Sequence, residues 1–341
     1  MEQAHYGRTA AGQDVDSFTL RNAGGVEMRC ISYGGRITHL LLPGQDGPCD
    51  ILLGYDTLAE YEADQMQQGA FVGRYAGLID GAAFELDGQT VHLAKNHGAH
   101  HLHGNLSHTV FTPQVMGESS VSFTATSPAG DEGFPGALQV TVTYTLTDEN
   151  ELVMDFRATT TADTHLNLTQ HSYFNLAGPG GDAMASLLHL NADRFLEARD
   201  ALLPTGRILP VAGGAFDFTT EKPIGQDIQK DDPQLVLAGG YDHSFVINRM
   251  RPGQLALAAI ARHPQSGRVL RLYTSQPAVH LYTGNGLSGE AGKDGVPMPP
   301  HGGFCLEYQH YADSPNHPEF PSTLLAAGEK YHEIAVWQFE F

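Results

Sequence analysis

The chain has 341 residues, of which 39 are Asp or Glu and 19 are Lys or Arg, so its formal net charge is −20 with histidine neutral. A hydrophobic content of 41% excludes an intrinsically disordered chain. The acidic balance argues against binding to nucleic acid or to an anionic membrane surface, and it favours solubility.

Alternation of apolar and polar residues with a period of two dominates the chain and predicts short β-strands. In chain order, we expect strands at 18–20, 26–31, 84–93 (a hairpin that turns at Asp87-Gly88), 121–125, 138–146, 152–156, 269–273, 279–282 and 334–339. Helix is predicted only at 57–64, with a further turn at 224–229. The scattered 39 Gly and 19 Pro fit tight turns between strands. The fold class is therefore predicted to be all-β and antiparallel, and the absence of a linker or a repeat predicts a single domain over residues 1–341.

Cysteine usage and the N-terminus bear on the compartment. Cys30, Cys49 and Cys305 form no CxxC pair and are too sparse for a disulfide framework, which fits a reducing compartment. The first residues lack a basic segment followed by an apolar run, and no apolar run approaches the ~20 residues that a spanning helix needs. We therefore expect a soluble, cytoplasmic protein.

The densest group of histidines lies in the predicted loop 96–105, which contains His97, His100, His101 and His103. Neutral imidazoles can converge on one metal ion, so a metal site is one interpretation. Surface histidines in a loop broken by glycine are the simpler interpretation for His97 and His100. His103 directly precedes Gly104, where a backbone turn can direct an imidazole into a cleft.

Three further positions are candidates for chemistry. His171 lies in a polar and aromatic stretch, where Thr169 and Tyr173 would share its face of a strand. Asp242 follows the double glycine 239–240, which is also explained by simple turn chemistry. Glu307 lies in an otherwise apolar and aromatic strand, where a lone carboxylate is unfavourable unless it is paired or functional.

A carboxylate, isolated histidines and an aspartate, with no nucleophile elbow, phosphate loop or dinucleotide fingerprint, favour proton transfer on a polyhydroxylated ligand. A base and an acid acting together can open a cyclic hemiacetal. The base takes the proton of the anomeric hydroxyl while the acid protonates the ring oxygen. This chemistry needs no cofactor.

Motifs at these same residues resemble the galactose mutarotase (aldose 1-epimerase) family, and they follow the family's order along nearly the whole chain. They are Gly73-Arg74-Tyr75-Ala76, His101-Leu102-His103-Gly104, the stretch 167–178, Gly240-Tyr241-Asp242-His243, Gln276-Pro277 with 282–285, Cys305-Leu306-Glu307, and Pro315-Asn316-His317-Pro318 followed by Phe320-Pro321. The resemblance implies a large antiparallel β-sandwich with few short helices and an open sugar cleft on one sheet. It also implies an enzyme that interconverts the α and β anomers of an aldose such as D-galactose or D-glucose.

The resemblance assigns a role to each motif residue. Glu307 matches the catalytic base and His171 the acid, while His103 matches a second histidine that holds the sugar near its ring oxygen. Asp242 matches the carboxylate that accepts hydrogen bonds from sugar hydroxyls, and Gln276 matches a polar contact in the cleft. Arg74 is a further candidate for substrate binding, although it need not face the sugar.

One position departs from the family pattern. The family usually has a second arginine four residues after the first, and that arginine reaches the substrate, but Leu78 occupies the position here. Losing a charged hydrogen bond to a substrate hydroxyl would weaken binding by roughly 1.5–3 kcal/mol. We therefore expect a weakened or altered sugar preference, toward a pentose or a deoxy sugar.

Three alternatives stay open. Epimerisation of a hexose 6-phosphate would need a basic pocket for the phosphate, which Leu78 and the net charge disfavour. A carbohydrate-binding protein without catalysis has no use for both Glu307 and His171. A metal enzyme would be built on the histidines of the loop 96–105. The expected partner is a small monosaccharide, and the protein is expected to be a monomer or a homodimer.

Overall fold

The computed structural model describes residues 1–45 and 47–341, and antiparallel β-strands make up most of its regular structure. The largest sheet has nine strands, in the order β11 (Thr112–Val115), β12 (Ser120–Ser127), β13 (Leu138–Leu146), β14 (Glu151–Thr160), β29 (Tyr331–Glu340), β23 (Val269–Thr274), β22 (Ala256–Arg262), β17 (Leu187–Leu190) and β20 (Lys222–Pro223).

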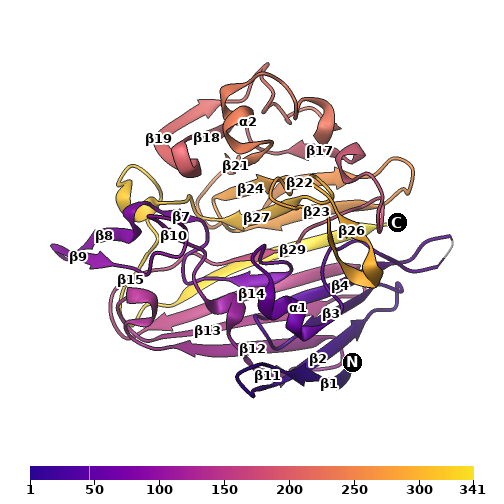
Figure 1. Cartoon of the computed structure of the whole chain (residues 1–341), viewed down its shortest axis with the longest axis horizontal. Helices are drawn as coiled ribbons and strands as arrows, with labels where there is room; N and C mark the ends of the chain where they lie inside the picture. The colour runs from indigo at the N-terminus through magenta and orange to yellow at the C-terminus, as the bar shows by residue number, and fades with distance from the viewer. Residues whose placement is uncertain (46) are drawn as a thin grey trace.

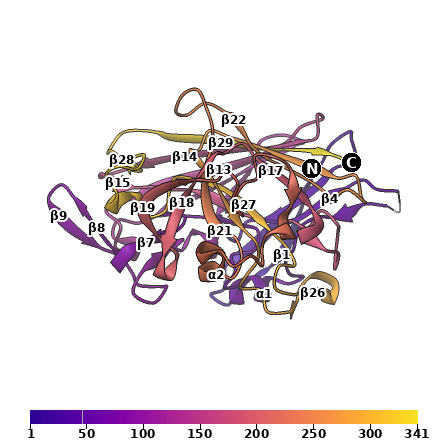
Figure 2. The same cartoon turned by 90° about the horizontal axis from the view of Figure 1, so that it is seen from above.

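Two five-stranded sheets accompany it. The first contains β1 (Glu2–Arg8), β2 (Asp14–Arg21), β3 (Glu27–Ile31), β4 (Arg36–Leu42) and β5 (Cys49–Asp50). The second has the order β19 (Leu203–Pro210), β18 (Arg194–Arg199), β21 (Asp242–Val246), β24 (Ala278–Tyr282) and β27 (Cys305–Gln309). Seen from above, the nine-stranded sheet forms one layer, and β4, β21 and β27 lie beneath it (Figure 2). The predicted all-β antiparallel sandwich is confirmed.

Short two-stranded ladders complete the structure. They pair β6 (Ala70–Val72) with β16 (Thr169–His171), β7 (Leu78–Ile79) with β10 (His101–Leu102), β8 (Ala83–Leu86) with β9 (Gln89–His92), β15 (Thr164–His165) with β28 (Leu324–Leu325), and β25 (Glu290–Ala291) with β26 (Pro297–Met298). Figure 1 shows β7 and β10 side by side at one end of the molecule. The hairpin of β8 and β9 was predicted, whereas β10 lies in the stretch 96–105 that the sequence predicted as a loop, because a two-residue strand leaves almost no periodic signal.

Period-two burial explains the long strands and the main core. Along β13, alternate side chains from Leu138 to Leu146 are buried, and they pair in register with β14, from Leu138 opposite Thr160 to Leu146 opposite Leu152. Each fully buried large apolar side chain contributes roughly 1.5–3 kcal/mol. The main hydrophobic cluster runs from Phe18 to Phe339 and includes side chains of all three large sheets, so it joins the two layers of the sandwich.

The predicted short helix is confirmed as α1 (Leu58–Ala63). Thr57 and Glu60 form a capping box at its start, and the helix buries its own residues Leu58 and Tyr61. The predicted turn at 224–229 is observed as a 3₁₀ turn at Ile224–Gln226. A second helix, α2 (Pro233–Ala238), was not predicted, although Asp232 caps it, Pro233 opens it and Gly239 ends it.

Within the described residues, no helix is both long enough and apolar enough to cross a membrane.

Candidate active site

The candidate site lies on the face of β21, β24 and β27 that points away from the nine-stranded sheet. On β27, Leu306 and Tyr308 belong to the main core, and the Tyr308 hydroxyl donates to Met154 of β14. Because successive side chains of a strand point to opposite faces, Cys305 and Glu307 point the other way. The same alternation places Asp242 and Ser244 of β21, and His280 of β24, on the outer face.

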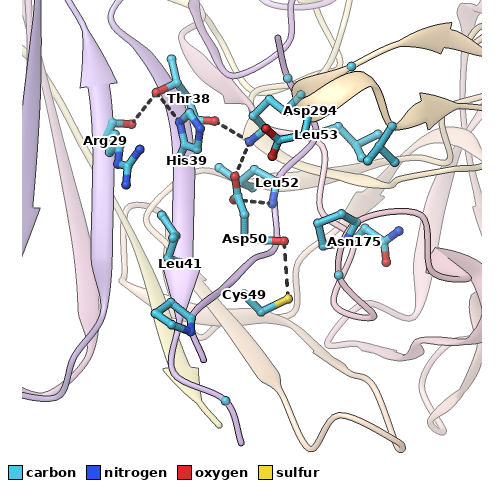
Figure 3. A pocket seen from close by; sticks show the side chains of 18 of the residues that line it. Arg29, Thr38, His39, Leu41, Cys49, Asp50, Leu52, Leu53, Asn175 and Asp294 are labelled. Atoms are coloured by element: carbon cyan, nitrogen blue, oxygen red, sulfur yellow. Dashed lines mark hydrogen bonds and ion pairs between the residues drawn. The ribbon is translucent and has the colours of Figure 1, made fainter. Parts of the chain in front are cut away.

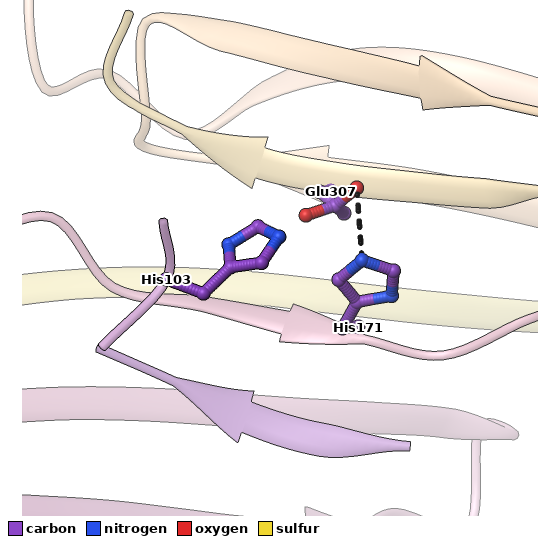
Figure 4. A group of neighbouring side chains, drawn as sticks. All are labelled: His103, His171 and Glu307. Carbon is purple, nitrogen blue, oxygen red and sulfur yellow. Dashed lines mark ion pairs between the residues drawn. The ribbon is translucent and has the colours of Figure 1, made fainter. Parts of the chain in front are cut away.

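Three of the predicted residues converge there, although they are far apart in the sequence. His103, His171 and Glu307 each offer a polar atom, and these atoms all lie within 4.8 Å of one another (Figure 4). His171 Nε2 is 3.6 Å from Glu307 Oε1. The rings of His103 and His171 are nearly perpendicular, with their centroids 5.4 Å apart. This spacing puts a base and two imidazoles around one small group of a ligand.

A backbone turn directs His103 into the site. His103 has a left-handed backbone with φ of 63°, and it follows β10 directly. Its Nδ1 accepts a hydrogen bond from the backbone N–H of Gly77 at 3.2 Å. Burial lowers the pKa of His103 to about 3, so the ring is neutral near pH 7. Since Nδ1 is an acceptor, Nε2 carries the proton and can donate it to a ligand oxygen.

His171 ends β16, where it is only 5% exposed. Its ring stacks on Tyr173, with the centroids 5.2 Å apart, and Cys305 Sγ lies 3.6 Å from its Nδ1. Burial lowers the pKa of His171 to about 4, although the charge of Glu307 acts in the opposite direction. His171 is therefore mostly neutral near pH 7, and the extra proton of its protonated form is weakly held.

Other polar residues of the same motif have structural roles. Asn167 donates to the backbone carbonyls of Ala76 and His310, and Gln170 donates to that of Gly69. These bonds fix the segment that carries His171 against its neighbours.

Asp242 forms part of a chain of hydrogen bonds that the sequence did not predict. Its Oδ1 lies 2.6 Å from His280 Nε2, and His280 Nδ1 lies 2.9 Å from Ser244 Oγ. Burial alone would raise the pKa of Asp242, but the hydrogen bond and charge of His280 outweigh it and hold the pKa below its ordinary value. For His280, burial alone would lower the pKa, but the hydrogen bond to Asp242 and the charges of Asp242 and Glu307 raise it.

His280 was missed because an isolated histidine in an alternating strand looks like a polar residue on a solvated face. The register corrects this interpretation, since His280 lies directly opposite Glu307 on β27 and opposite Ser244 on β21. Side chains directly opposite one another on adjacent strands are in contact distance. The signal that was available is the polar residue His280 inside the predicted apolar strand 279–282.

The structure does not place Arg74 among these groups. Arg74 is 1% exposed, and all five of its N–H groups are used by the protein itself. The guanidinium donates to Ser127 Oγ and to the backbone carbonyls of Ser127, Pro128, Pro135 and Gly136. No donor of Arg74 is left for a sugar. The prediction that Arg74 binds the substrate is therefore replaced by a structural role for this residue.

Gln276 is likewise not at the site. Its side chain is fully buried in the connection between β23 and β24, and its amide donates to Tyr331 Oη at 2.8 Å and to the backbone carbonyl of Leu168 at 3.3 Å. These contacts tie the connection to β29 and to the segment before β16. The polar contact predicted for Gln276 is corrected accordingly, and His280 is the polar group of β24 that faces Glu307.

The histidines of the loop 96–105 point in different directions. His97 is exposed, His100 Nδ1 accepts from the backbone N–H of Gly81, and His101 Nδ1 donates to the carbonyl of Ala94. Only His103 reaches Glu307. In the part of the chain that the structure describes, the one group with metal-like spacing is that of His103, His171 and Glu307.

Leu78 lies beside the anchor of His103. It pairs with Leu102 in the ladder of β7 and β10, and it directly follows Gly77, whose N–H and carbonyl both bond to His103. Its backbone carbonyl accepts from Asp313, and its side chain is 8% exposed. An aliphatic residue therefore stands next to the turn that forms one wall of the site.

A separate cavity of about 1280 Å³ contains none of the predicted site residues. It runs beside β4, where Arg29, Thr38, His39, Cys49 and Asp50 line it (Figure 3). Its half-buried Lys293 is already bonded within the protein, because Nζ donates to the Thr38 carbonyl and lies 2.5 Å from Asp50 Oδ2. The cavity thus offers space, but its lysine and its aspartate are already paired with each other.

Comparisons with known proteins agree with this geometry. The family model described as aldose 1-epimerase matches residues 16–336. A galactose mutarotase of Sus scrofa is 40% identical over 331 residues, which cover 95% of this chain and 94% of that protein. The crystal structure of a GalM/aldose epimerase homologue from C. elegans has a TM-score of 0.87 at 31% identity, covering 95% of this chain and 98% of that one. That of a galactose 1-epimerase from Lactobacillus acidophilus has a TM-score of 0.86 at 29% identity, covering 99% and 98%.

Proposed function

Because the chain belongs to the aldose 1-epimerase family and is an isomerase of that kind, we propose that its substrate is a free aldose such as D-galactose or D-glucose and that Glu307 and His171 perform the proton transfers. The observation that carries this proposal is the 3.6 Å separation between Glu307 Oε1 and His171 Nε2 on the outer face of the sheet. A carboxylate and an imidazole at this spacing can reach the anomeric hydroxyl and the ring oxygen of one sugar.

In the proposed reaction, Glu307 removes the proton from the C1 hydroxyl as His171, acting from the small fraction that is protonated near pH 7, passes a proton to the ring oxygen. The bond between C1 and the ring oxygen breaks, which leaves an open-chain aldehyde, a protonated Glu307 and a neutral His171. Rotation about the C1–C2 bond presents the other face of the carbonyl. The two groups then exchange roles, so the ring closes as the opposite anomer and the pair regains its starting state.

The neighbouring groups are assigned to binding. His103 donates from Nε2 toward the ring oxygen, and Asp242 accepts hydrogen bonds from sugar hydroxyls. The low pKa of His103 supports this role, because burial keeps the ring neutral and leaves Nδ1 bonded to Gly77. No step in this mechanism requires a cofactor.

Leu78 supports a narrower proposal about sugar preference. An aliphatic side chain beside the His103 turn offers no hydrogen bond to a substrate hydroxyl. We expect weaker discrimination in favour of the fully hydroxylated hexose, and therefore relatively better use of a pentose or a deoxy sugar.

Two alternatives are disfavoured. A hexose 6-phosphate would need free cations at the site, whereas His103 and His171 beside Glu307 are mostly neutral near pH 7, His280 is paired with Asp242, and Arg74 has no free donor. A purely sugar-binding protein would gain nothing from a base placed opposite an acid.

Polarimetry of freshly dissolved α-D-galactose, α-D-glucose, L-arabinose and glucose 6-phosphate tests the proposal. We expect the protein to accelerate relaxation to the anomeric equilibrium for the free sugars, with heat-inactivated protein as the control. Acceleration confined to the phosphorylated sugar would favour the first alternative. Binding without acceleration would favour the second.

We also propose a cytoplasmic protein that is a monomer or a homodimer, forms one domain over residues 1–341, and binds neither nucleic acid nor membranes. The free thiols of Cys30, Cys49 and Cys305 and the net charge of −20 support the compartment and the absence of polyanionic partners. The main core, which includes side chains from Phe18 to Phe339, supports a single domain.

A further inference from the structure

A third imidazole stands beside the proton-transfer pair. His280 lies in the middle of β24, between Ser244 on β21 and Glu307 on β27, and its side chain is 18% exposed. Both ring nitrogens are engaged, Nε2 with Asp242 at 2.6 Å and Nδ1 with Ser244 at 2.9 Å. With neither nitrogen free, His280 can act on a sugar only through its neighbours.

We propose that His280 is a positioning residue that fixes the Asp242 carboxylate in one orientation, so that the second oxygen of Asp242 is presented to the hydroxyls of the bound sugar. This inference rests on the proposed function. An imidazolium is the strongest partner available for the carboxylate, because a charge-assisted hydrogen bond is roughly twice as strong as a neutral one. Ser244 holds the other side of the ring and so sets its plane.

The charges around His280 determine the pH range in which its ring is protonated and can pair with Asp242 as an imidazolium. The titratable groups that face it are Asp242 on β21, Glu307 on β27, and His103 and His171 from the segments that cover the sheet. The two carboxylates favour the imidazolium. The other two histidines have lowered pKa values and are neutral near pH 7, so they do not oppose it in that range.

The direction of the pH effect follows. His280 is protonated below its raised pKa and loses the proton as the pH rises beyond it, at a pH above the ordinary value of 6.5. Asp242 stays ionised throughout, because its pKa is lowered. The KM for the sugar should therefore be constant at mildly acidic pH and should rise on the alkaline side.

The experiment measures kcat and KM for α-D-galactose between pH 5.5 and 9 in the wild type, His280→Gln, Asp242→Asn and the double variant. We expect His280→Gln to raise KM about tenfold at pH 6.5, to change kcat by less than about threefold, and to abolish the alkaline rise in KM. Because His280 acts through Asp242, the double variant should have the KM of Asp242→Asn alone. His332→Gln is the matched control, since His332 also pairs with an aspartate, Asp155, across neighbouring strands at 3.0 Å but is largely exposed.

A wild-type KM and pH profile in His280→Gln would overturn the inference, and so would additive effects in the double variant. Ser244→Ala, which removes only the second partner, gives a milder change in the same direction and covers the case in which His280→Gln does not fold. NMR titration of the His280 ring in sugar-free protein separates this inference from the proposed function. If the wild type does not accelerate mutarotation, the proposed function fails, yet Asp242→Asn must still lower the pKa of His280, and an unchanged pKa would refute the pairing.

Discussion

Replacing Glu307 by glutamine removes the proposed base while keeping the size of the side chain. Glu307 is 3% exposed, and its closest ionic partner, His171 Nε2, lies beyond hydrogen-bond distance at 3.6 Å. The substitution therefore breaks no strong pair, and the melting temperature should change by no more than a few degrees. The rate should change much more, since a positioned general base typically contributes about 10²–10⁴-fold.

This factor corresponds to about 3–5 kcal/mol of transition-state stabilisation, at 1.36 kcal/mol for each tenfold. Polarimetry of α-D-galactose at saturating concentration measures it, with Glu151→Gln as the control. Glu151 lies on β14, where its side chain accepts from Gln338, so its replacement should leave the rate unchanged. A loss of tenfold or less that appears only in KM would refute the reasoning, because it would make Glu307 a hydrogen-bond acceptor for the sugar and not the base.

Four other perturbations test separate parts of the structure. Leu78→Arg should lower the KM for galactose by roughly ten- to a hundredfold relative to that for arabinose, because it restores a charged donor near the His103 turn. Arg74→Met should lower the free energy of unfolding by roughly 3–5 kcal/mol, measured by urea denaturation, since it leaves buried carbonyls without donors. Dialysis against a chelator should leave mutarotation unchanged, measured by polarimetry. The free energy of unfolding should fall as the pH drops from 6.5 toward 4, by about 2 kcal/mol at pH 5 for each of His165 and His243, because burial lowers both pKa values to about 4 and only the unfolded chain takes up the protons readily.

Each of these expectations has a contrary result. Unchanged kinetics on galactose, glucose and arabinose in Leu78→Arg would end the argument about sugar preference. A stable Arg74→Met variant with a raised KM would return Arg74 to the substrate site. Activity that is lost to the chelator and restored by zinc would make His103, His171 and Glu307 metal ligands. Stability that stays level between pH 6.5 and 5 would mean that the buried histidines accept protons in the folded state.

The strands that the sequence predicts correctly are those whose burial alternates over many residues, such as β13 and β14. The same rule could not find β7 or β10, because two residues have no period. It also could not separate Arg74 and Gln276 from the site. Both belong to motifs rich in functional residues, but whether a polar side chain faces a cleft or donates to carbonyls in the interior depends on tertiary packing.

Glu307 was a candidate from the sequence for the opposite reason, whereas the role of His171 rested on the resemblance to the family. A carboxylate in an apolar strand is unfavourable wherever that strand lies, so Glu307 could be singled out without the fold. His280 required the register, since only the pairing of β24 with β21 and β27 brings it between Ser244 and Glu307. Sequence alone thus singled out a residue whose type is unusual for its own strand. It missed His280, whose significance depends on the residues that strand pairing places beside it.

The position of β24 has an evolutionary consequence. This strand is hydrogen-bonded along both edges, so His280 shares the stability of a whole sheet, and the amides of β24 should exchange with solvent only when that sheet opens. Leu78 instead belongs to a ladder of two-residue strands, and His103 directly follows that ladder. Substitutions in that ladder disturb little else, whereas substitutions in β24 disturb two neighbours at once. Lineages that keep the ring-opening chemistry can therefore acquire new sugars by changing the ladder, and the central strand should change last.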